Sequence, residues 1–189
     1  MPVRTALPVE IRAKAAVARR RRLQALDGTL DYRTAHQQKY WNDPAGWVRD
    51  CIDWRSNEAG AADYQNEIMS ALPVQLRVSA RAPHGAGKSS MAAWVVLWFA
   101  DTRDGQDWKI ATTASAWRQL TKYLWPEIHK WARRLKWEVI GRRPYVTGKD
   151  MLEQSLKGAT GEAFAVASDN PDLIEGAHAD HLLYLFDES

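Results

Sequence analysis

The chain has 189 residues, of which 46% are apolar, so it can bury one sizeable core and is not disordered along its whole length. The single cysteine, Cys51, excludes an internal disulfide and a paired-cysteine zinc site, and we expect a small buried side chain in a reducing cytoplasm. The longest apolar run, Met91 to Ala100, is shorter than the roughly 18 residues that a membrane span needs. We therefore expect a soluble, cytoplasmic protein with no membrane partner.

The first 40 residues are basic, with nine Lys or Arg against three Asp or Glu, although the net charge of the whole chain is only +3. The run Arg19-Arg20-Arg21-Arg22 can contact phosphates, or it can be a solvated helix face or a tail. Residues 8–26 have a helix-forming composition, and Asp27-Gly28 supplies a stop. We expect a helical, basic region over residues 1–60, in which Asp43-Pro44 marks a turn or a helix start, ahead of a main fold over residues 61–189.

The main fold begins with a predicted helix and a predicted strand. The helix runs from Asp63 to Leu72 and is closed by Pro73. From Val74 to Arg81 apolar and polar residues alternate, which is the period of a strand. Ser89 to Ala100 is apolar nearly all round, as expected for a helix packed under a sheet, and Trp108 to Thr113 reads as a second strand.

The next predicted helix carries an apolar stripe, and Pro126 marks a kink or a restart in it. Basic and aromatic residues interleave along this helix, a pattern that is also found on nucleic-acid-binding surfaces. Because Trp117 and Trp131 belong to the stripe, we expect them in the core, with the basic back of the helix left as a DNA or subunit contact. The stripe comprises Trp117, Leu120, Leu124, Ile128, Trp131 and Leu135.

The last part of the chain predicts further strands. Met151 to Leu156 and Ala163 to Ala167 can pair as a hairpin across Lys157 to Glu162. Leu182 to Phe186 is a continuous apolar run, typical of a strand buried on both faces. Alternating strands and helices predict an α/β fold with a mainly parallel sheet and flanking helices. His178, Asp180 and His181 lie close together, but we expect loop residues here and assign no metal.

A phosphate-binding loop is predicted between the first strand and the second helix of the main fold. The match is complete except that Ala82 replaces the first glycine. Backbone N–H groups and the positive helix end can cradle a triphosphate there, whereas an ordinary glycine-rich turn is the alternative. Lys88 would reach the β- and γ-phosphates, and the Ser89 hydroxyl would bind Mg²⁺. The predicted ATP-binding residues of this loop are His84, Gly85, Ala86, Gly87, Lys88 and Ser89.

Two acids follow the last predicted strand. Asp187, at the carboxyl end of an apolar strand, can hold Mg²⁺ through water, and Glu188 can orient and deprotonate the attacking water. Alone, such a pair would be solvated loop acids. Downstream of a phosphate loop within a β/α pattern, it becomes the matching Walker B signal.

Two further features precede the loop. In Tyr64-Gln65 the amide can bond the two edges of adenine and the ring can stack on it, although such a pair is often structural. Arg81 can swing its guanidinium to the γ-phosphate as a catalytic finger, with plain solvent exposure as the alternative.

From about Tyr64 to Ser189 the sequence resembles the ATPase domain of bacteriophage terminase large subunits. Tyr64-Gln65 looks like the adenine motif of that family, Arg81 to Ser89 like its variant Walker A motif, and Thr112 to Gln119 like the segment after its second strand. The run from Glu175 to Asp180, which leads into the last strand, resembles the family's approach to Walker B and is the most family-specific piece.

The resemblance implies a P-loop NTPase that uses ATP and Mg²⁺ to drive double-stranded DNA into a capsid in the host cytoplasm. Its partners would be DNA, a portal, a small terminase subunit and further copies of itself in a ring. The sequence stops one residue past Glu188, so we expect a partial P-loop domain with little turnover by itself and assign no nuclease residues. The alternatives are a helicase-like P-loop ATPase acting on nucleic acid and a non-catalytic fragment that binds nucleotide.

Overall fold

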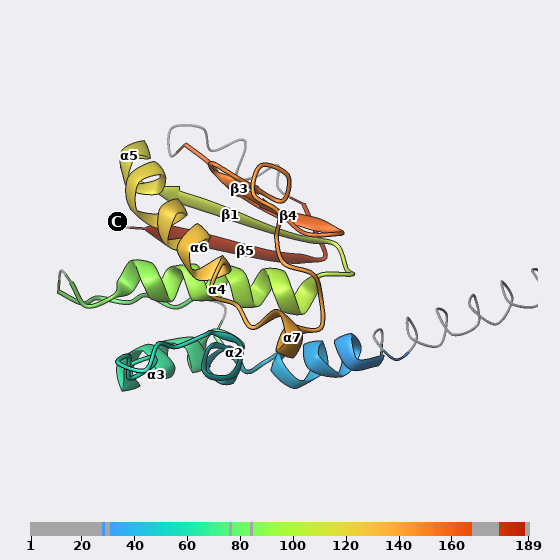
Figure 1. Ribbon diagram of the computed structural model, residues 1–189. Helices are drawn as coiled ribbons and strands as arrows, with labels where there is room; N and C mark the ends of the chain where they lie inside the picture. The colour runs from blue at the N-terminus through green and yellow to red at the C-terminus, as the bar shows by residue number, and fades with distance from the viewer. Residues whose placement is uncertain (1–27, 29–30, 76, 84, 168–177, 188–189) are drawn as a thin grey trace, which may run out of the picture.

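The computed structural model describes residues 28, 31–75, 77–83, 85–167 and 178–187, which form a mixed α/β unit around one five-stranded sheet (Figure 1). The sheet order is β2-β3-β4-β1-β5. Strands β4, β1 and β5 are parallel, whereas β2 and β3 are antiparallel to their neighbours. The strand bounds are β1 Trp108–Ala114, β2 Met151–Leu152, β3 Ser155–Lys157, β4 Gly161–Ala165 and β5 His181–Asp187.

The α/β class is confirmed, but the sheet is mixed rather than mainly parallel. The segment Met151 to Leu156 is not one strand, because a turn at residues 153–154 divides it into β2 and β3. The predicted hairpin is present between β3 and β4. Connections this short cannot make the crossover that parallel neighbours require, so these strands pair antiparallel.

Helix α4 contacts β1, β4 and β5 of the sheet and also contacts α6, whereas α2 and α3 lie beyond α4, farther from the sheet (Figure 1). Residues 31–40 form a helix within the region expected to be helical, at a position that was not predicted. The helix predicted over residues 8–26, like the arginine run within it, lies outside the described residues. The remaining bounds are α2 Pro44–Cys51, α3 Asp63–Ala71, α4 Lys88–Arg103, α5 Trp117–Gln119, η1 Leu120–Leu124, α6 Trp125–Ala132 and α7 Trp137–Ile140.

Helix α4 is the centre of the core, as its apolar sequence predicts, and every side chain from Ala93 to Arg103 is buried. The 31–40 helix and α2 cover it. Trp98 Nε1 donates a hydrogen bond to the Tyr40 carbonyl at 2.7 Å, and Trp47 Nε1 donates to Asp101 Oδ2 at 2.7 Å. This part of residues 1–60 therefore shares the core of the main fold. In the described ranges, no helix has both the length and the apolar character that crossing a membrane requires.

The predicted helix start at Asp43-Pro44 and the predicted burial of Cys51 are both confirmed. The Asp43 carboxylate accepts a hydrogen bond from the Gly46 N–H at 2.8 Å, and Pro44 occupies the first turn, where its missing N–H costs nothing. Cys51 is a free, buried cysteine at the end of this helix.

The strand predicted from Val74 to Arg81 is not formed in the described residues of that segment. Val74 is 84% exposed, and the sheet order ends at β5, so no described strand pairs with the outer edge of β5. Alternation specifies which way side chains point but supplies no partner for the backbone hydrogen bonds.

Strand β5 is confirmed, and it pairs with β1 along its whole length from His181 to Asp187. The expectation that both its faces are buried was wrong. Phe186 is 65% exposed and Tyr184 is 38% exposed. A continuous apolar run indicates a strand of a parallel sheet, but it does not reveal that the strand lies at the edge.

The helical segment after β1 has a π-helical turn at η1, directly before α6 and Pro126. Leu120, Leu124 and Ile128 are fully buried, and Trp131 is buried, as predicted. Trp117 is 44% exposed, so its predicted place in the core was wrong. The i→i+5 turn inserts one residue into the helical period and rotates the residues before it off the stripe.

Candidate functional site

The predicted phosphate loop leads directly into α4. Gly85 and Gly87 have φ angles of +80° and +79°, in the left-handed region that residues with a side chain rarely adopt. Gly87 is the N-cap of α4 and has no side chain with which to cap the first-turn N–H groups. An anion can bind such N–H groups at the positive end of the helix dipole. The start of α4 therefore presents first-turn N–H groups that no side chain caps.

The Lys88 side chain folds back onto this loop. Its Nζ donates hydrogen bonds to the carbonyl oxygens of Ala82, at 2.6 Å, and Pro83, at 3.1 Å. An ammonium group has three donors, so one N–H remains for a phosphate oxygen. Ser89 is half-buried in the first turn of α4, and Arg81 is exposed just before the loop. His84 lies outside the described residues.

Asp187 ends β5 in register with Ala114, the last residue of β1. Because the strands are parallel, their carboxyl ends meet at one edge of the sheet, and the start of α4 lies at the same end of the molecule (Figure 1). Asp187 and the loop are thus at the same end of the fold. Glu188 lies outside the described residues.

Helix α3 contacts the phosphate loop through the two residues that the sequence singled out. The Tyr64 hydroxyl donates a hydrogen bond to the Ala86 carbonyl, and Gln65 Nε2 donates to the Gly87 carbonyl at 3.2 Å. Gln65 Oε1 accepts from the Ala62 N–H at 2.9 Å, and the side chain is only 6% exposed. The oxygen and the nitrogen of this amide each bond the backbone. The sequence contained a partial signal, because a Gln three residues after an N-cap is one half of a capping box.

A carboxylate that sequence reasoning missed, Glu127, ties α6 to the first turn of α4. The Ser90 hydroxyl and Trp131 Nε1 each donate to Glu127 Oε2 at 2.9 Å, and Lys130 Nζ donates to Oε1 at 2.8 Å. Partial burial opposes ionisation of Glu127, but these hydrogen bonds and the charge of Lys130 outweigh it, so its pKa lies below the ordinary value. The spacing to Lys130 and Trp131 is visible in the sequence, whereas the bond to Ser90 is not.

We expect Glu127→Gln to lower the free energy of unfolding by about 1–2 kcal/mol at pH 7, because hydrogen bonds to a charged group are the stronger kind. A carboxylate with a lowered pKa stabilises the fold above its unfolded pKa, and this contribution is lost as the pH falls through the folded pKa. Urea unfolding at pH 7 and at acidic pH measures both effects. Glu67→Gln, at an exposed position on α3, is the control. A loss that stays the same at acidic pH would contradict the role of the charge.

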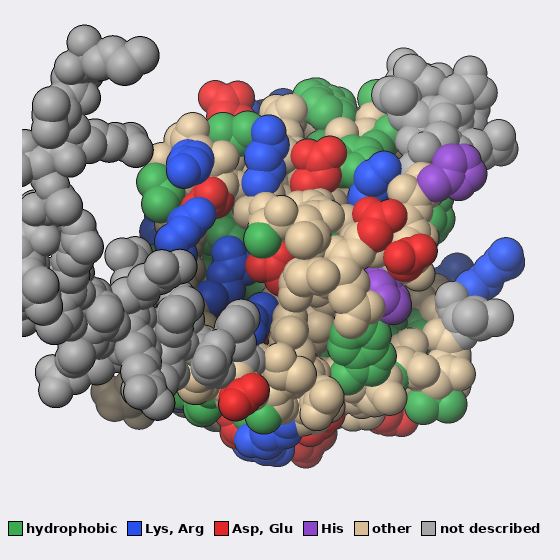
Figure 2. All heavy atoms as spheres, turned by 90° about the vertical axis from the view of Figure 1, so that its right-hand side faces the viewer, with side chains coloured by type: hydrophobic (Ala, Val, Ile, Leu, Met, Phe, Trp, Pro, Cys, Tyr) green, Lys and Arg blue, Asp and Glu red, His purple; other side chains and the backbone are tan. Residues whose placement is uncertain are grey.

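Exposed aromatic and basic side chains gather on α5 and η1, which follow the carboxyl end of β1. Trp117 and Tyr123 are 44% and 58% exposed, and Arg118 and Lys122 are exposed beside them. Aromatic rings and cations at such spacing can contact bases and phosphates. The opposite end of the molecule has acidic and basic side chains intermixed on its described surface (Figure 2). The α5–η1 surface is therefore the better nucleic-acid candidate.

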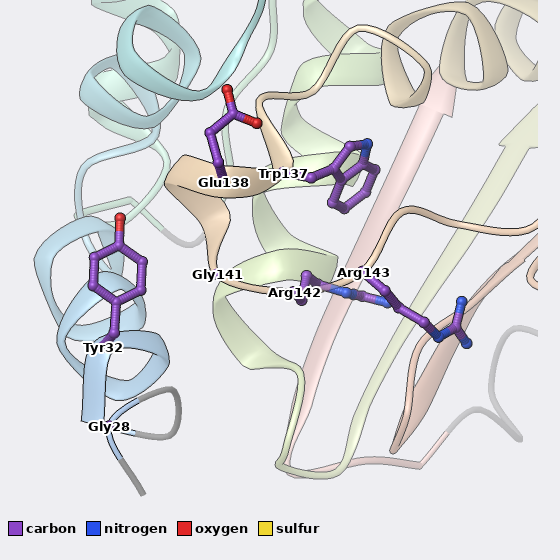
Figure 3. A pocket seen from close by; sticks show the side chains of 7 residues that line it. All are labelled: Gly28, Tyr32, Trp137, Glu138, Gly141, Arg142 and Arg143. Carbon is purple, nitrogen blue, oxygen red and sulfur yellow. The ribbon is translucent and has the colours of Figure 1, made fainter. Parts of the chain in front are cut away.

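A separate hollow of about 600 Å³ lies between α7 and the 31–40 helix (Figure 3). Both arginines that line it have a carboxylate partner: Arg142 pairs with Asp104 at 3.2 Å, and Arg143 pairs with Asp150 at 2.5 Å. No predicted site residue lines it. Its lining residues are Gly28, Tyr32, Trp137, Glu138, Gly141, Arg142 and Arg143.

Among the residues that the structure describes, no cluster of three or more His, Cys, Asp or Glu side chains is placed to hold a metal ion. The predicted Mg²⁺ site does not need one, because Mg²⁺ is bound by one or two protein oxygens together with phosphates and water. His181 instead contacts Gln106 Oε1 at 2.5 Å and the Trp41 ring. No protein-family model matches the chain, and no curated protein matches it either.

Proposed function

We propose that this chain is the ATP-binding part of a P-loop motor ATPase that packages double-stranded DNA, of the terminase large subunit type. The observation that carries the proposal is the loop at the start of α4. It combines two left-handed glycines, an uncapped helix end and the Lys88 ammonium folded onto the loop carbonyls. Asp187, at the same end of the fold, supports it (Figure 1).

In this proposal different residues bind the phosphates, the Mg²⁺ ion and the attacking water. The first-turn N–H groups of α4 and the Lys88 ammonium bind the phosphates. The Ser89 hydroxyl and the Asp187 carboxylate hold Mg²⁺, which offsets the charge that develops on the γ-phosphate. Glu188 orients and deprotonates the attacking water, and Arg81, exposed before the loop, supplies a second cation.

The surroundings of the loop fit a bulky anion. A Cβ added at Gly85 meets no heavy atom within 4 Å, so there is open space beside the loop. The described residues 77–83 form no strand beside β5. The strand that precedes the phosphate loop in a P-loop fold is therefore part of what we propose. Contacts from α3, rather than a neighbouring strand, hold the loop in this structure.

Nucleic acid as the substrate to be moved is supported by the α5–η1 surface. Trp117, Arg118, Lys122 and Tyr123 are exposed on the segment that follows β1. The resemblance of Glu175 to Asp180 to the approach to Walker B favours packaging over unwinding. A portal, a small terminase subunit and a ring of identical subunits complete the proposed assembly.

The test is ATP hydrolysis by the complete gene product with double-stranded DNA, with single-stranded DNA and without DNA. We expect double-stranded DNA to stimulate turnover most. Glu188→Gln should lower turnover by about 10² or more while ATP still binds, because the acid that activates water is lost and Asp187 keeps the charge at the metal. Glu67→Gln is the matched control. Unchanged turnover would remove Glu188 from this role, and stimulation by single strands alone would favour the helicase-like alternative.

A further inference from the structure

We propose that Tyr64 and Gln65 are positioning residues that hold the phosphate loop in its binding shape, and that Gln65 does not read the base. The site then takes nucleoside triphosphates through their phosphates, and ATP and GTP bind with similar affinity. This inference rests on the proposed function of the loop. It differs from the adenine-binding role that the sequence predicts for the same pair.

Both the oxygen and the nitrogen of the Gln65 side-chain amide are hydrogen-bonded to the backbone. Its Nε2 donates to the Gly87 carbonyl at 3.2 Å, its Oε1 accepts from the Ala62 N–H at 2.9 Å, and the side chain is 94% buried, since only 6% is exposed. Recognition of adenine needs one donor and one acceptor turned toward the purine edge. Turning the amide outward would break both bonds and release the Gly87 carbonyl from α3, leaving it only the bond from the Met91 N–H.

The contacts of α3 converge on two consecutive loop carbonyls. Tyr64 donates to the Ala86 carbonyl and Gln65 to the Gly87 carbonyl, which also accepts the first hydrogen bond of α4 from the Met91 N–H at 3.0 Å. A Cβ built on Gly87 would lie 2.9 Å from Gln65 Nε2 and 4.0 Å from the Tyr64 hydroxyl. The glycine is therefore packed directly against this pair of side chains.

The loop needs such support because of its own composition. Gly85 and Gly87 lose more conformational freedom on ordering than any other residue would. The described residues 77–83, on the N-terminal side of the loop, form no strand that could fix it from the sheet. Instead, helix α3 holds the loop through the hydrogen bonds that Tyr64 and Gln65 donate to its carbonyls. A loop ordered before binding avoids an ordering cost that would otherwise reduce affinity for every triphosphate equally.

The experiment measures the binding of ATP, GTP and inorganic tripolyphosphate to the wild type and to two variants by calorimetry. Gln65→Ala removes both amide bonds, whereas Tyr64→Phe removes only the hydroxyl and keeps a ring that can stack. We expect each variant to weaken all three probes by a similar factor, about 10-fold, with the ratio of ATP to GTP affinity unchanged. Glu67→Ala, exposed on the same helix, is the control and should leave all three affinities unchanged.

The outcomes separate the inference from the function on which it rests. Loss of ATP affinity without loss of GTP or tripolyphosphate affinity in Gln65→Ala would show that Gln65 reads the base and would overturn the inference alone. Unchanged affinities in Tyr64→Phe would also overturn the inference for Tyr64. A wild type that binds none of the probes would overturn both proposals. Tyr64→Phe alters a partly exposed side chain, so its thermal unfolding should match the wild type and separate positioning from folding.

Discussion

Lys88→Ala is expected to lower the affinity for ATP by about 10²-fold or more. The Lys88 ammonium lies on the carbonyl oxygens of Ala82 and Pro83, within the loop that would surround the phosphates. Charge-assisted bonds to phosphate are about twice as strong as neutral ones, and the loop offers no other lysine to replace them. Calorimetry with ATP and Mg²⁺ measures the loss.

The matched control is Lys149→Ala, which removes an exposed lysine elsewhere in the chain and should leave ATP affinity unchanged. Thermal unfolding of both variants shows whether the fold persists. Equal ATP affinity in Lys88→Ala and the wild type would refute the assignment of the phosphate loop, whatever the resemblance of the sequence.

Asp101→Ala is expected to lower the free energy of unfolding by about 3–5 kcal/mol, because it leaves buried partners without their counter-charge. Asp101 is 2% exposed in the middle of the helical layer. Arg33 Nη1 lies 2.6 Å from its Oδ1, and Oδ2 is 2.8 Å from His36 Nε2 and 2.7 Å from Trp47 Nε1. One carboxylate therefore joins the 31–40 helix, α2 and α4.

The pH dependence of this contribution has a definite sign. Burial opposes ionisation of Asp101, but the hydrogen bond from His36 and the charge of Arg33 outweigh it, so the pKa of Asp101 is lowered. The contribution is fully present above the unfolded pKa of about 3.9 and is lost as the pH falls through the folded pKa. Urea unfolding of the wild type and Asp101→Ala should therefore give curves that converge on acidification.

Asp107→Ala, at an exposed loop position, is the control and should change stability by less than about 0.5 kcal/mol at every pH. A loss below about 1 kcal/mol in Asp101→Ala at pH 7 would mean that the network does not hold these helices together.

Local chemistry made several elements predictable. The Asp43 cap with Pro44 starts α2, and the apolar sequence of α4 places it in the core. The sequences of β1 and β5 each predict a strand, and both strands are formed. Each of these depends on residues a few positions apart, where helix and strand periods act directly.

The candidate site was predictable to the same extent. Gly85 and Gly87 have the left-handed φ angles that a phosphate loop needs. The sequence motif of adjacent residues predicts glycines with such angles at these positions. The same spacing puts Lys88 and Ser89 in the first turn of α4. What these residues bind stays a prediction.

The sequence by itself determined the loop, its helix and the strands that can pair, because their signals lie in neighbouring residues. Only the tertiary structure decided that Gln65 bonds the loop, that Glu127 bonds Ser90, and that β5 is an edge strand. It also decided that Trp117 faces outward, since a π-helical turn shifts the period before Leu124. Hydrogen-bond partners distant in sequence are chosen by how the elements pack, and a period of 2 or 3.6 residues carries no information about that choice.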